Sequence, residues 1–122
     1  MNQSKKNKYD LEERTAKFGL QTIKFCQSIK QDAITKPLMS QLIRSATSIG
    51  ANYMEANGAS SKNDFRNKIF ICKKETQETK HWLRMLSEAV PDKAEELRKL
   101  WMECQELTLI FQKITTTLKA RK

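Results

Sequence analysis

The sequence predicts an all-α protein, and three observations carry that prediction. Its 122 residues include only 3 glycines and 2 prolines, too few turn formers for a protein of many short strands. Helix-favouring Lys, Glu, Gln, Leu, Ala and Ile are abundant. Apolar residues recur at three- and four-residue steps over four segments with short connections, a pattern typical of an antiparallel up-and-down four-helix bundle. We expect one domain over residues 1–122, with 1–9 and 119–122 as flexible basic tips.

The first helix is expected from Asp10 to about Lys30. The Asp10 carboxylate can accept hydrogen bonds from the free amides of the first turn, so it suits the N-cap position. The apolar stripe that follows consists of Leu11, Phe18, Thr22, Phe25 and Ile29.

The second helix is expected from Pro37 to Asn57. Pro37 suits a first turn because its φ is fixed and it needs no acceptor. Gly58 is expected to stop the helix in the left-handed conformation. This helix is slim on more than one side, because Ser, Ala, Thr and Gly interrupt its larger residues. Its stripe consists of Leu38, Leu42, Ala46, Ile49, Tyr53 and Ala56.

The third and fourth helices begin at polar caps. Ser60 or Ser61 can cap the third, with Asp64 in its first turn, and Pro91 begins the fourth. The third stripe consists of Phe65, Ile69, Cys72, Thr76, Thr79, Leu83 and Leu86. The fourth consists of Leu97, Leu100 or Trp101, Cys104, Leu107, Phe111, Ile114 and Leu118.

The tight connection between the second and third helices fixes which residues face each other, because antiparallel neighbours pair at equal distances from their turn. Arg44 should lie level with Glu75 and about a turn from Glu78, while Glu55 should lie near Arg66. Paired carboxylates can in principle act as acid and base. Since no histidine or metal ligand accompanies them, we interpret these residues as structural ion pairs that set register and assembly.

Charge is the strongest functional signal. Lys and Arg number 23 against 14 Asp and Glu, a net charge of +9, which is typical of proteins with polyanionic partners but also serves solubility. Two sets of basic residues recur at four or seven residues, so each forms a stripe on one helix face. Such a stripe is either a solvated face or a phosphate-contacting surface. The candidates are Lys17 and Lys24 on the first helix and Lys62, Arg66, Lys73, Lys80 and Arg84 on the third.

Aromatic residues add a weaker signal of the same kind. Tyr53, Trp82 and Trp101 can stack on nucleotide bases, but aromatic residues in helical phase more often pack in a core or an interface.

Other functional classes receive little support from the sequence. Cys26, Cys72 and Cys104 lack the spacing of a zinc site or a disulfide framework, so we expect buried free thiols. His81 is the single histidine, too little for a triad or a metal centre. We therefore expect no metal, no cofactor and no catalytic site. No apolar run approaches the ~20 residues of a membrane span, and we expect a cytoplasmic protein.

Three blocks of the chain resemble a known family. They are "LEERTAKF", "QLIRSATSIGANYMEA" and "DFRNKIFICKKETQETKHWLRML", and together they span roughly Tyr9 to Leu86. In order and spacing they resemble the four-helix-bundle proteins called 23S ribosomal RNA intervening-sequence proteins, a family that is similar to the accessory protein of diversity-generating retroelements. Gly19 departs from the family, where Ala is more common, and should loosen the first helix by ~1 kcal/mol if it is exposed.

The resemblance implies an antiparallel bundle that assembles into a homopentamer and has no enzymatic activity. In the retroelement branch it also implies association with RNA and with a reverse transcriptase. We therefore expect a non-enzymatic, homo-oligomeric protein that contacts RNA through basic helix faces. The alternative is a structural adaptor that docks a protein partner, such as a reverse transcriptase, without binding RNA.

Overall fold

The computed structural model describes residues 10–120. In this part of the chain four α-helices follow one another, with no strand, so the prediction of an all-α chain is confirmed. The helices are α2 (Leu11–Gln27), α3 (Thr35–Asn57), α4 (Lys62–Ala89) and α5 (Ala94–Ala120), and a 3-10 turn (Pro91–Lys93) precedes the last.

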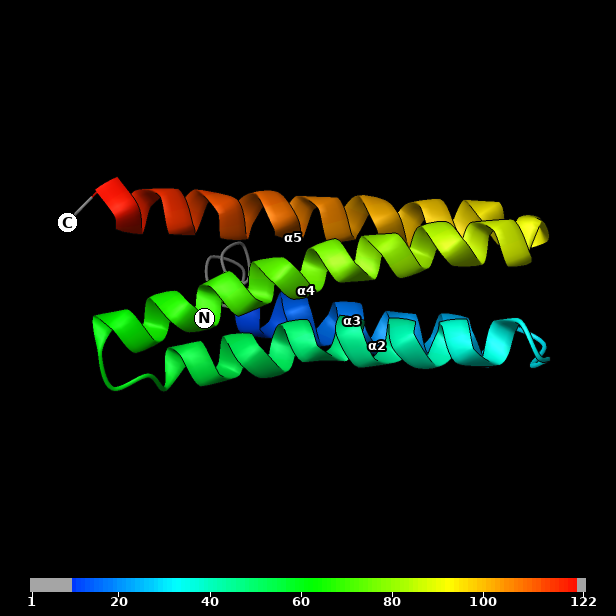
Figure 1. Cartoon of the computed structure of the whole chain (residues 1–122), viewed down its shortest axis with the longest axis horizontal. Coiled ribbons are helices and arrows are strands. Elements are labelled where there is room, and N and C mark those ends of the chain that lie inside the picture. Colours follow the sequence, from blue (N-terminus) through cyan, green and yellow to red (C-terminus); the bar gives the residue numbers. More distant parts are fainter. Residues whose placement is uncertain (1–9, 121–122) are drawn as a thin grey trace, which may run out of the picture.

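The helices form a bundle in which each runs back along the one before it (Figure 1). The close neighbours are α2 with α3, α3 with α4 and α4 with α5, while α2 and α5 touch more sparsely and α2 and α4 do not touch. In Figure 1, α4 crosses obliquely from the α3 side to the start of α5. The α4 helix therefore has two flanks, one against α3 and one against α5.

The beginning of α2 follows the sequence prediction, but its end does not. The Asp10 carboxylate accepts a hydrogen bond from the Glu13 amide at 3.1 Å. The helix ends at Gln27 rather than near Lys30. The Ser28 hydroxyl donates to the Phe25 carbonyl at 2.6 Å, a local bond that competes with helix continuation.

The start of α3 corrects the prediction that Pro37 opens the helix. The helix begins two residues earlier, at Thr35, because the Asp32 carboxylate accepts from the Ile34 and Thr35 amides at 2.8 Å each. The Thr35 hydroxyl in turn donates to the Lys30 carbonyl at 2.8 Å. Pro37 still lies in the first turn, where its missing N–H costs nothing.

The connections on either side of α4 differ from the predictions in detail. After α4, Pro91 begins the 3-10 turn rather than the fourth helix, and α5 begins at Ala94. Gly58 ends α3 with a φ of −97°, so the predicted left-handed conformation is wrong. Its amide instead bonds the Met54 and Glu55 carbonyls at 3.3 and 3.2 Å. Ser61 is the cap of α4 and accepts from the Asp64 amide at 3.0 Å, which decides between the two predicted serines.

The predicted tips are shorter than expected at the C-terminal end. Residues 119 and 120 belong to α5 and are helical rather than flexible. The remaining residues of the predicted tips, 1–9 and 121–122, lie outside the described residues.

One apolar core runs the length of the bundle, and the predicted stripes supply nearly all of it. Leu100 is buried and Trp101 is 39% exposed, which settles the alternative left open at that position. Buried threonines satisfy their hydroxyls within the helices; for example, Thr22 donates to the Phe18 carbonyl at 2.9 Å. The largest fully buried apolar residues are Phe18, Leu42, Ile49, Ile69, Leu83, Leu86, Leu107 and Phe111.

The small residues of α3 face two neighbouring helices, α4 and α2. On the α4 side, the buried Ser45 and Thr79 hydroxyls hydrogen-bond at 2.9 Å. On the α2 side, a methyl group on Gly50 would lie 3.2 Å from the Thr15 hydroxyl, so only glycine allows this approach without a shift. Gly19 is buried rather than exposed, and a methyl group there would make ordinary contact with Thr47 at 3.5 Å. Small side chains in α3 therefore allow both neighbouring helices to pack closely.

Candidate functional site: the two flanks of α4

The α3 side of α4 carries the ion pairs that the hairpin register predicts. The Arg44 guanidinium lies 3.5 Å from the Glu75 carboxylate and 2.5 Å from that of Glu78. The Glu75 side chain is 13% exposed, whereas those of Arg44 and Glu78 are 46% and 40% exposed. The cluster therefore lies at the surface, with Glu75 as its most buried member.

The two carboxylates respond differently to this environment. Burial, followed by the charge of Glu78, raises the pKa of Glu75. The hydrogen bond from Arg44 lowers the pKa of Glu78. Burial therefore favours the neutral form of Glu75, whereas Arg44, which reaches across from α3, favours the charged form of Glu78. This arrangement is that of a structural pair rather than an acid and base facing a substrate.

Glu55 has a different partner from the one predicted. Its carboxylate lies 2.8 Å from the Lys68 ammonium, and no ion pair with Arg66 forms within the described residues. Residues 66 and 68 point about 200° apart around an α-helix, so only one of them can face α3. We call Arg44, Glu55, Lys68, Glu75 and Glu78 the paired flank.

The opposite side of α4 faces α5 and is basic. Positions 66, 70, 73, 77, 80 and 84 follow each other at four- and three-residue steps, so they share one face. The Lys80 ammonium reaches α5, where it donates to the Gln105 side-chain carbonyl at 2.5 Å and lies 5.3 Å from the centre of the Trp101 ring. We call the set Lys62, Arg66, Phe70, Lys73, Lys80 and Arg84 the basic flank.

The cations of the basic flank have no acidic partner. Within residues 10–120, none of their nitrogens lies within 4.0 Å of a carboxylate oxygen, whereas Arg14, Arg44, Lys68 and Arg98 each have one. The polar partner of Lys80 is a neutral amide. The positive charge along this side of α4 is therefore not neutralised by any carboxylate among residues 10–120.

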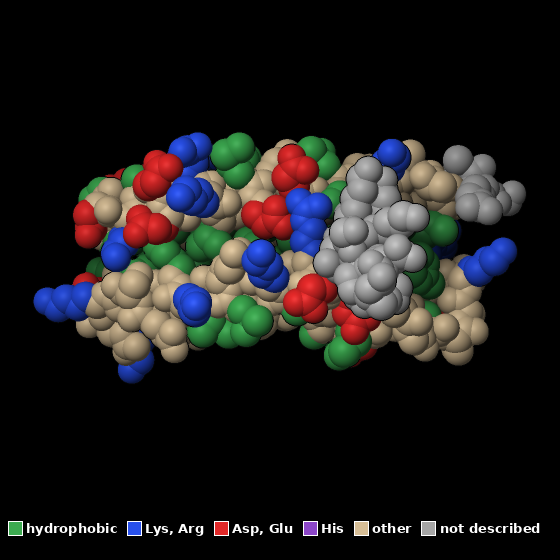
Figure 2. Space-filling model, turned by 180° about the vertical axis from the view of Figure 1, so that it is seen from behind, with side chains coloured by type: hydrophobic (Ala, Val, Ile, Leu, Met, Phe, Trp, Pro, Cys, Tyr) green, Lys and Arg blue, Asp and Glu red, His purple; other side chains and the backbone are tan. Residues whose placement is uncertain are grey.

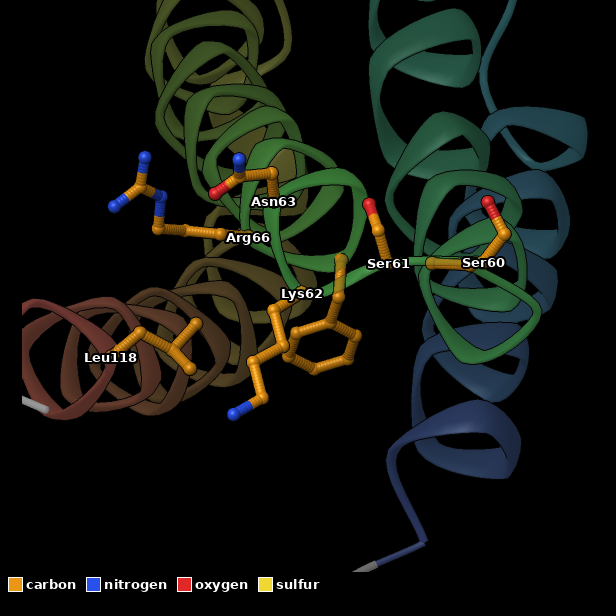
Figure 3. Close-up of a pocket in the computed structure, with 8 residues that line it drawn as sticks. Ser60, Ser61, Lys62, Asn63, Arg66 and Leu118 are labelled. Carbon is orange, nitrogen blue, oxygen red and sulfur yellow. The ribbon is translucent and has the colours of Figure 1, made fainter. Parts of the chain in front are cut away.

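A hollow lies at one end of the basic flank, between the α3–α4 turn and the end of α5. It is lined by Ser60, Lys62, Phe65, Arg66 and Leu118 among others. Figure 3 shows Lys62 and Arg66 extending from α4 on the side of Leu118. The Arg66 Nε is buried and has no hydrogen-bond partner among the described residues. The hollow thus brings two unpaired cations next to an apolar wall.

The two basic candidates on α2 do not join this surface. Lys17 and Lys24 are exposed, and α2 lies diagonally opposite α4 in the bundle. Lys24 borders a separate hollow between α2 and α5 that also contains Glu96 and Lys99. From behind, Figure 2 shows acidic and basic side chains interspersed on that side of the molecule. The structure therefore groups the five candidates on α4 and leaves these two apart.

The aromatic candidates are also divided by the fold. Tyr53 and Trp82 are partly buried against the core, and the Tyr53 ring lies 6.0 Å from that of Phe111. His81 packs edge-on against Trp82, with ring centres 4.8 Å apart. Trp101 is 39% exposed beside the basic flank. Phe70 is equally exposed within it, and sequence analysis missed this residue although its spacing from Arg66 and Lys73 could have found it.

The cysteines are free and buried, as predicted. Burial raises the pKa of Cys26 to about 11 and those of Cys72 and Cys104 to about 12. The Cys104 thiol donates to the Thr76 carbonyl at 3.2 Å. Because the thiolate is the reactive form, these groups act as core packing rather than as nucleophiles.

An apolar groove runs along the outside of the α2–α3 contact. Its floor contains Ala16, Gly19 and Gly50, and Leu20 and Met54 on its edges are 63% and 57% exposed. Ile23 continues it into a second hollow with Met39 and Ile43. The small residues of α2 and α3 therefore create a surface that the rest of residues 10–120 leaves uncovered.

Residues 10–120 contain neither a metal-binding cluster nor a membrane-spanning helix. Nowhere in this range do three His, Cys, Asp or Glu side chains gather as a metal ion requires. The helices are also too polar for any of them to span a bilayer.

Fold and site together define a basic, all-α helical bundle in which a row of cations lines one side of α4 without a carboxylate partner among residues 10–120. The model of the 23S rRNA-intervening sequence protein family matches residues 7–113, so the chain belongs to this family. A crystal structure of a protein of unknown function from the S23 ribosomal protein family of Bacteroides thetaiotaomicron superposes with a TM-score of 0.76 at 28% identity. The match covers 85% of this chain and 96% of that one. No curated protein matches the chain.

Proposed function

We propose that this protein is a non-enzymatic, homo-oligomeric RNA-associated protein that contacts RNA phosphates through the basic flank of α4. The observation that carries the proposal is the absence of acidic partners along this flank within residues 10–120, next to a paired flank on the same helix. Unpaired Lys and Arg on a helix face attract phosphate groups and release counterions from them. Membership of a family named for ribosomal RNA supports the same partner.

The proposed homo-oligomer is a pentamer, as the family resemblance implies. The uncovered apolar groove along α2 and α3 supports self-association, since exposed apolar patches edged by polar residues often mark interfaces. Repeating the basic flank around a ring increases affinity, because each additional contact is intramolecular. Native mass spectrometry tests this directly, with a mass of five chains expected. A monomer at micromolar concentration would contradict it.

Salt dependence of RNA binding tests the proposed contact. We expect the affinity for RNA to fall steeply as salt rises, because phosphate contacts release counterions. The double variant Lys73→Glu/Arg84→Glu should weaken binding by about 100-fold or more, with a shallower salt slope.

The matched control reverses two lysines elsewhere, Lys30→Glu/Lys99→Glu, and changes the net charge equally. Both control residues are exposed; Lys30 follows α2, which does not contact α4, and Lys99 borders the hollow between α2 and α5. We expect their effect to be within about threefold, since only distant charge changes. Equal losses in both variants, or no binding of RNA at low salt, would refute the proposed surface.

The second candidate is an adaptor that docks a protein partner, and the α2–α3 groove favours it. Apolar grooves of this kind receive amphipathic helices from partners. If RNA fails to bind at low salt while Leu20→Glu/Met54→Glu abolishes capture of a purified partner such as a reverse transcriptase, the adaptor is the correct function.

A further inference from the structure

We infer that the basic flank binds single-stranded RNA in particular, with bases stacking on Trp101 and Phe70. This inference rests on the proposed function, because it specifies the kind of RNA that the same surface takes. It starts from the aromatic side chains, which a surface that contacts only phosphates does not need.

Both rings lie where an RNA strand on the basic flank would pass. Phe70 occupies the face shared by Arg66 and Lys73, and it is 39% exposed. Trp101 is also 39% exposed and lies on α5 beside Lys80. Charged groups and exposed rings therefore alternate along one continuous surface, which is the arrangement of single-strand binding proteins.

The Trp101 ring is held in place before any ligand arrives. The Lys80 ammonium lies 5.3 Å from the ring centre and is itself tied to Gln105 by a hydrogen bond of 2.5 Å. A cation over an indole is an attractive contact. Because the ring is already oriented, less conformational entropy is lost when a base stacks on it.

The spacing of the rings suits a short strand. Phe70 precedes Lys80 by ten residues on α4, which corresponds to about 15 Å along the helix. A strand of a few nucleotides spans this distance with one base near each ring. Lys73 and Gln77 lie between the rings on the same face and can contact the phosphates and sugars in between.

A duplex cannot use these rings. Its bases are already stacked on one another, and the major groove of A-form RNA is too narrow for side chains to reach them. A double helix would engage only the cations, so Phe70 and Trp101 would contribute little. Preference for a single strand therefore separates stacking from simple phosphate attraction.

Tryptophan fluorescence provides a direct test. In the full chain with Trp82→Phe, Trp101 is the only remaining tryptophan. We expect an oligoadenylate of about ten nucleotides to quench its emission, because a stacked base contacts the indole. The same strand paired with oligouridylate should bind at least about tenfold more weakly and leave the emission unchanged.

Two alanine variants measure the contribution of each ring. Trp101→Ala and Phe70→Ala should each weaken single-strand binding by about tenfold and leave duplex binding unchanged. The controls are Met102→Ala and Leu109→Ala, whose side chains are exposed by 54% but are not aromatic. They should bind like the parent protein, and thermal melting verifies that all four variants fold.

The outcomes distinguish this inference from the proposed function. If single strand and duplex bind equally and the ring variants bind like the parent, the stacking inference is wrong, even where Lys73→Glu/Arg84→Glu abolishes binding. If no RNA binds at all, the proposed function itself fails.

Discussion

The two flanks of α4 differ in how their charges are balanced, although they belong to one helix. On the paired flank, Arg44 lies between Glu75 and Glu78, and Glu55 holds Lys68. On the basic flank, the polar partner of Lys80 is the neutral Gln105. Charges that are matched within the chain hold helices in register, while charges left unmatched are available to a partner. Changes on one flank should therefore alter stability, and changes on the other should alter binding.

Reversing charges on each flank gives the largest expected contrast. Glu75→Lys/Glu78→Lys places two cations next to Arg44 and should lower the free energy of unfolding by about 2 kcal/mol. Lys73→Glu/Arg84→Glu should change the free energy of unfolding by less than about 0.5 kcal/mol, because neither cation has an ion-pair partner to lose. Urea denaturation measures both. Equal destabilisation by the two variants would show that the flanks do not differ.

Removing the central arginine tests the paired flank alone. Arg44→Ala should lower the free energy of unfolding by about 1 kcal/mol, because both carboxylates lose their partner at a partly exposed site. A fully buried carboxylate left unpaired would cost about 3 to 5 kcal/mol, but the 46% exposure of Arg44 argues for the smaller value. The conservative Arg44→Lys should recover part of the loss. A melting curve identical to the parent's would show that the cluster adds nothing to stability.

A single isosteric change can make the basic flank resemble the paired one. Gln105→Glu places a carboxylate against the Lys80 ammonium, so an internal ion pair replaces a neutral contact. We expect RNA affinity to fall by about threefold to tenfold and the fold to stay at least as stable. Filter binding at several salt concentrations measures this, with Gln112→Glu on the same helix as a comparison. Unchanged affinity would mean that Lys80 takes no part in binding.

The smallest expected effect is the pH dependence of stability in the variants Glu78→Gln and Glu75→Gln. The pKa of Glu78 is lowered, so its carboxylate stabilises the fold above the ordinary value of 4.5, and this contribution is lost as pH falls through the folded-state pKa. The pKa of Glu75 is raised, so its contribution is present below 4.5 and is lost as pH rises through the folded-state pKa.

These opposite signs predict opposite shifts in stability. At pH 7, Glu78→Gln should be less stable than the parent by about 0.5 kcal/mol, and Glu75→Gln should be at least as stable as the parent. The difference for Glu78→Gln should shrink as the pH falls below 4.5, whereas the difference for Glu75→Gln should shrink earlier, as the pH falls from 7 toward 4.5. Thermal melting between pH 3 and 7 follows them. If both variants shifted stability in the same direction, the assignment of Glu75 as the buried carboxylate and Glu78 as the one held by Arg44 would be wrong.

Much of the fold could be predicted because it depends on local sequence. Apolar spacing located all four helices, Asp10 was correctly expected as a cap, and Ser61 is one of the two serines expected to cap α4. Errors arose where the backbone at a helix end found a hydrogen-bond partner that the sequence pattern did not indicate. Because Asp32 accepts from the first amides of α3, the helix begins before Pro37. The Gly58 amide donates to helix carbonyls without adopting a left-handed conformation. Such bonds depend on how a loop closes, which periodicity does not describe.

The candidate site was predictable in part for the same reason. Equal spacing from the α3–α4 turn placed Arg44 beside Glu75 and Glu78, because an antiparallel hairpin fixes register within a few residues. The same counting gave Glu55 the wrong partner, since it ignored that Arg66 and Lys68 point to different sides of α4. It also could not show that Phe70 is exposed, because exposure depends on how closely α5 packs.

The sequence by itself determined the helices, their apolar stripes, the buried thiols and the excess of positive charge, because each follows from residue type and from the 3.6-residue period. Only the tertiary structure decided the partners that counting along the hairpin did not give, such as Lys68 for Glu55 and Gln105 for Lys80. Packing α4 between α3 and α5 neutralised one of its flanks and left the other unpaired, and it placed Trp101 of α5 beside Lys80. The partners of a charge are set by neighbouring helices, and their orientation is a property of the whole bundle.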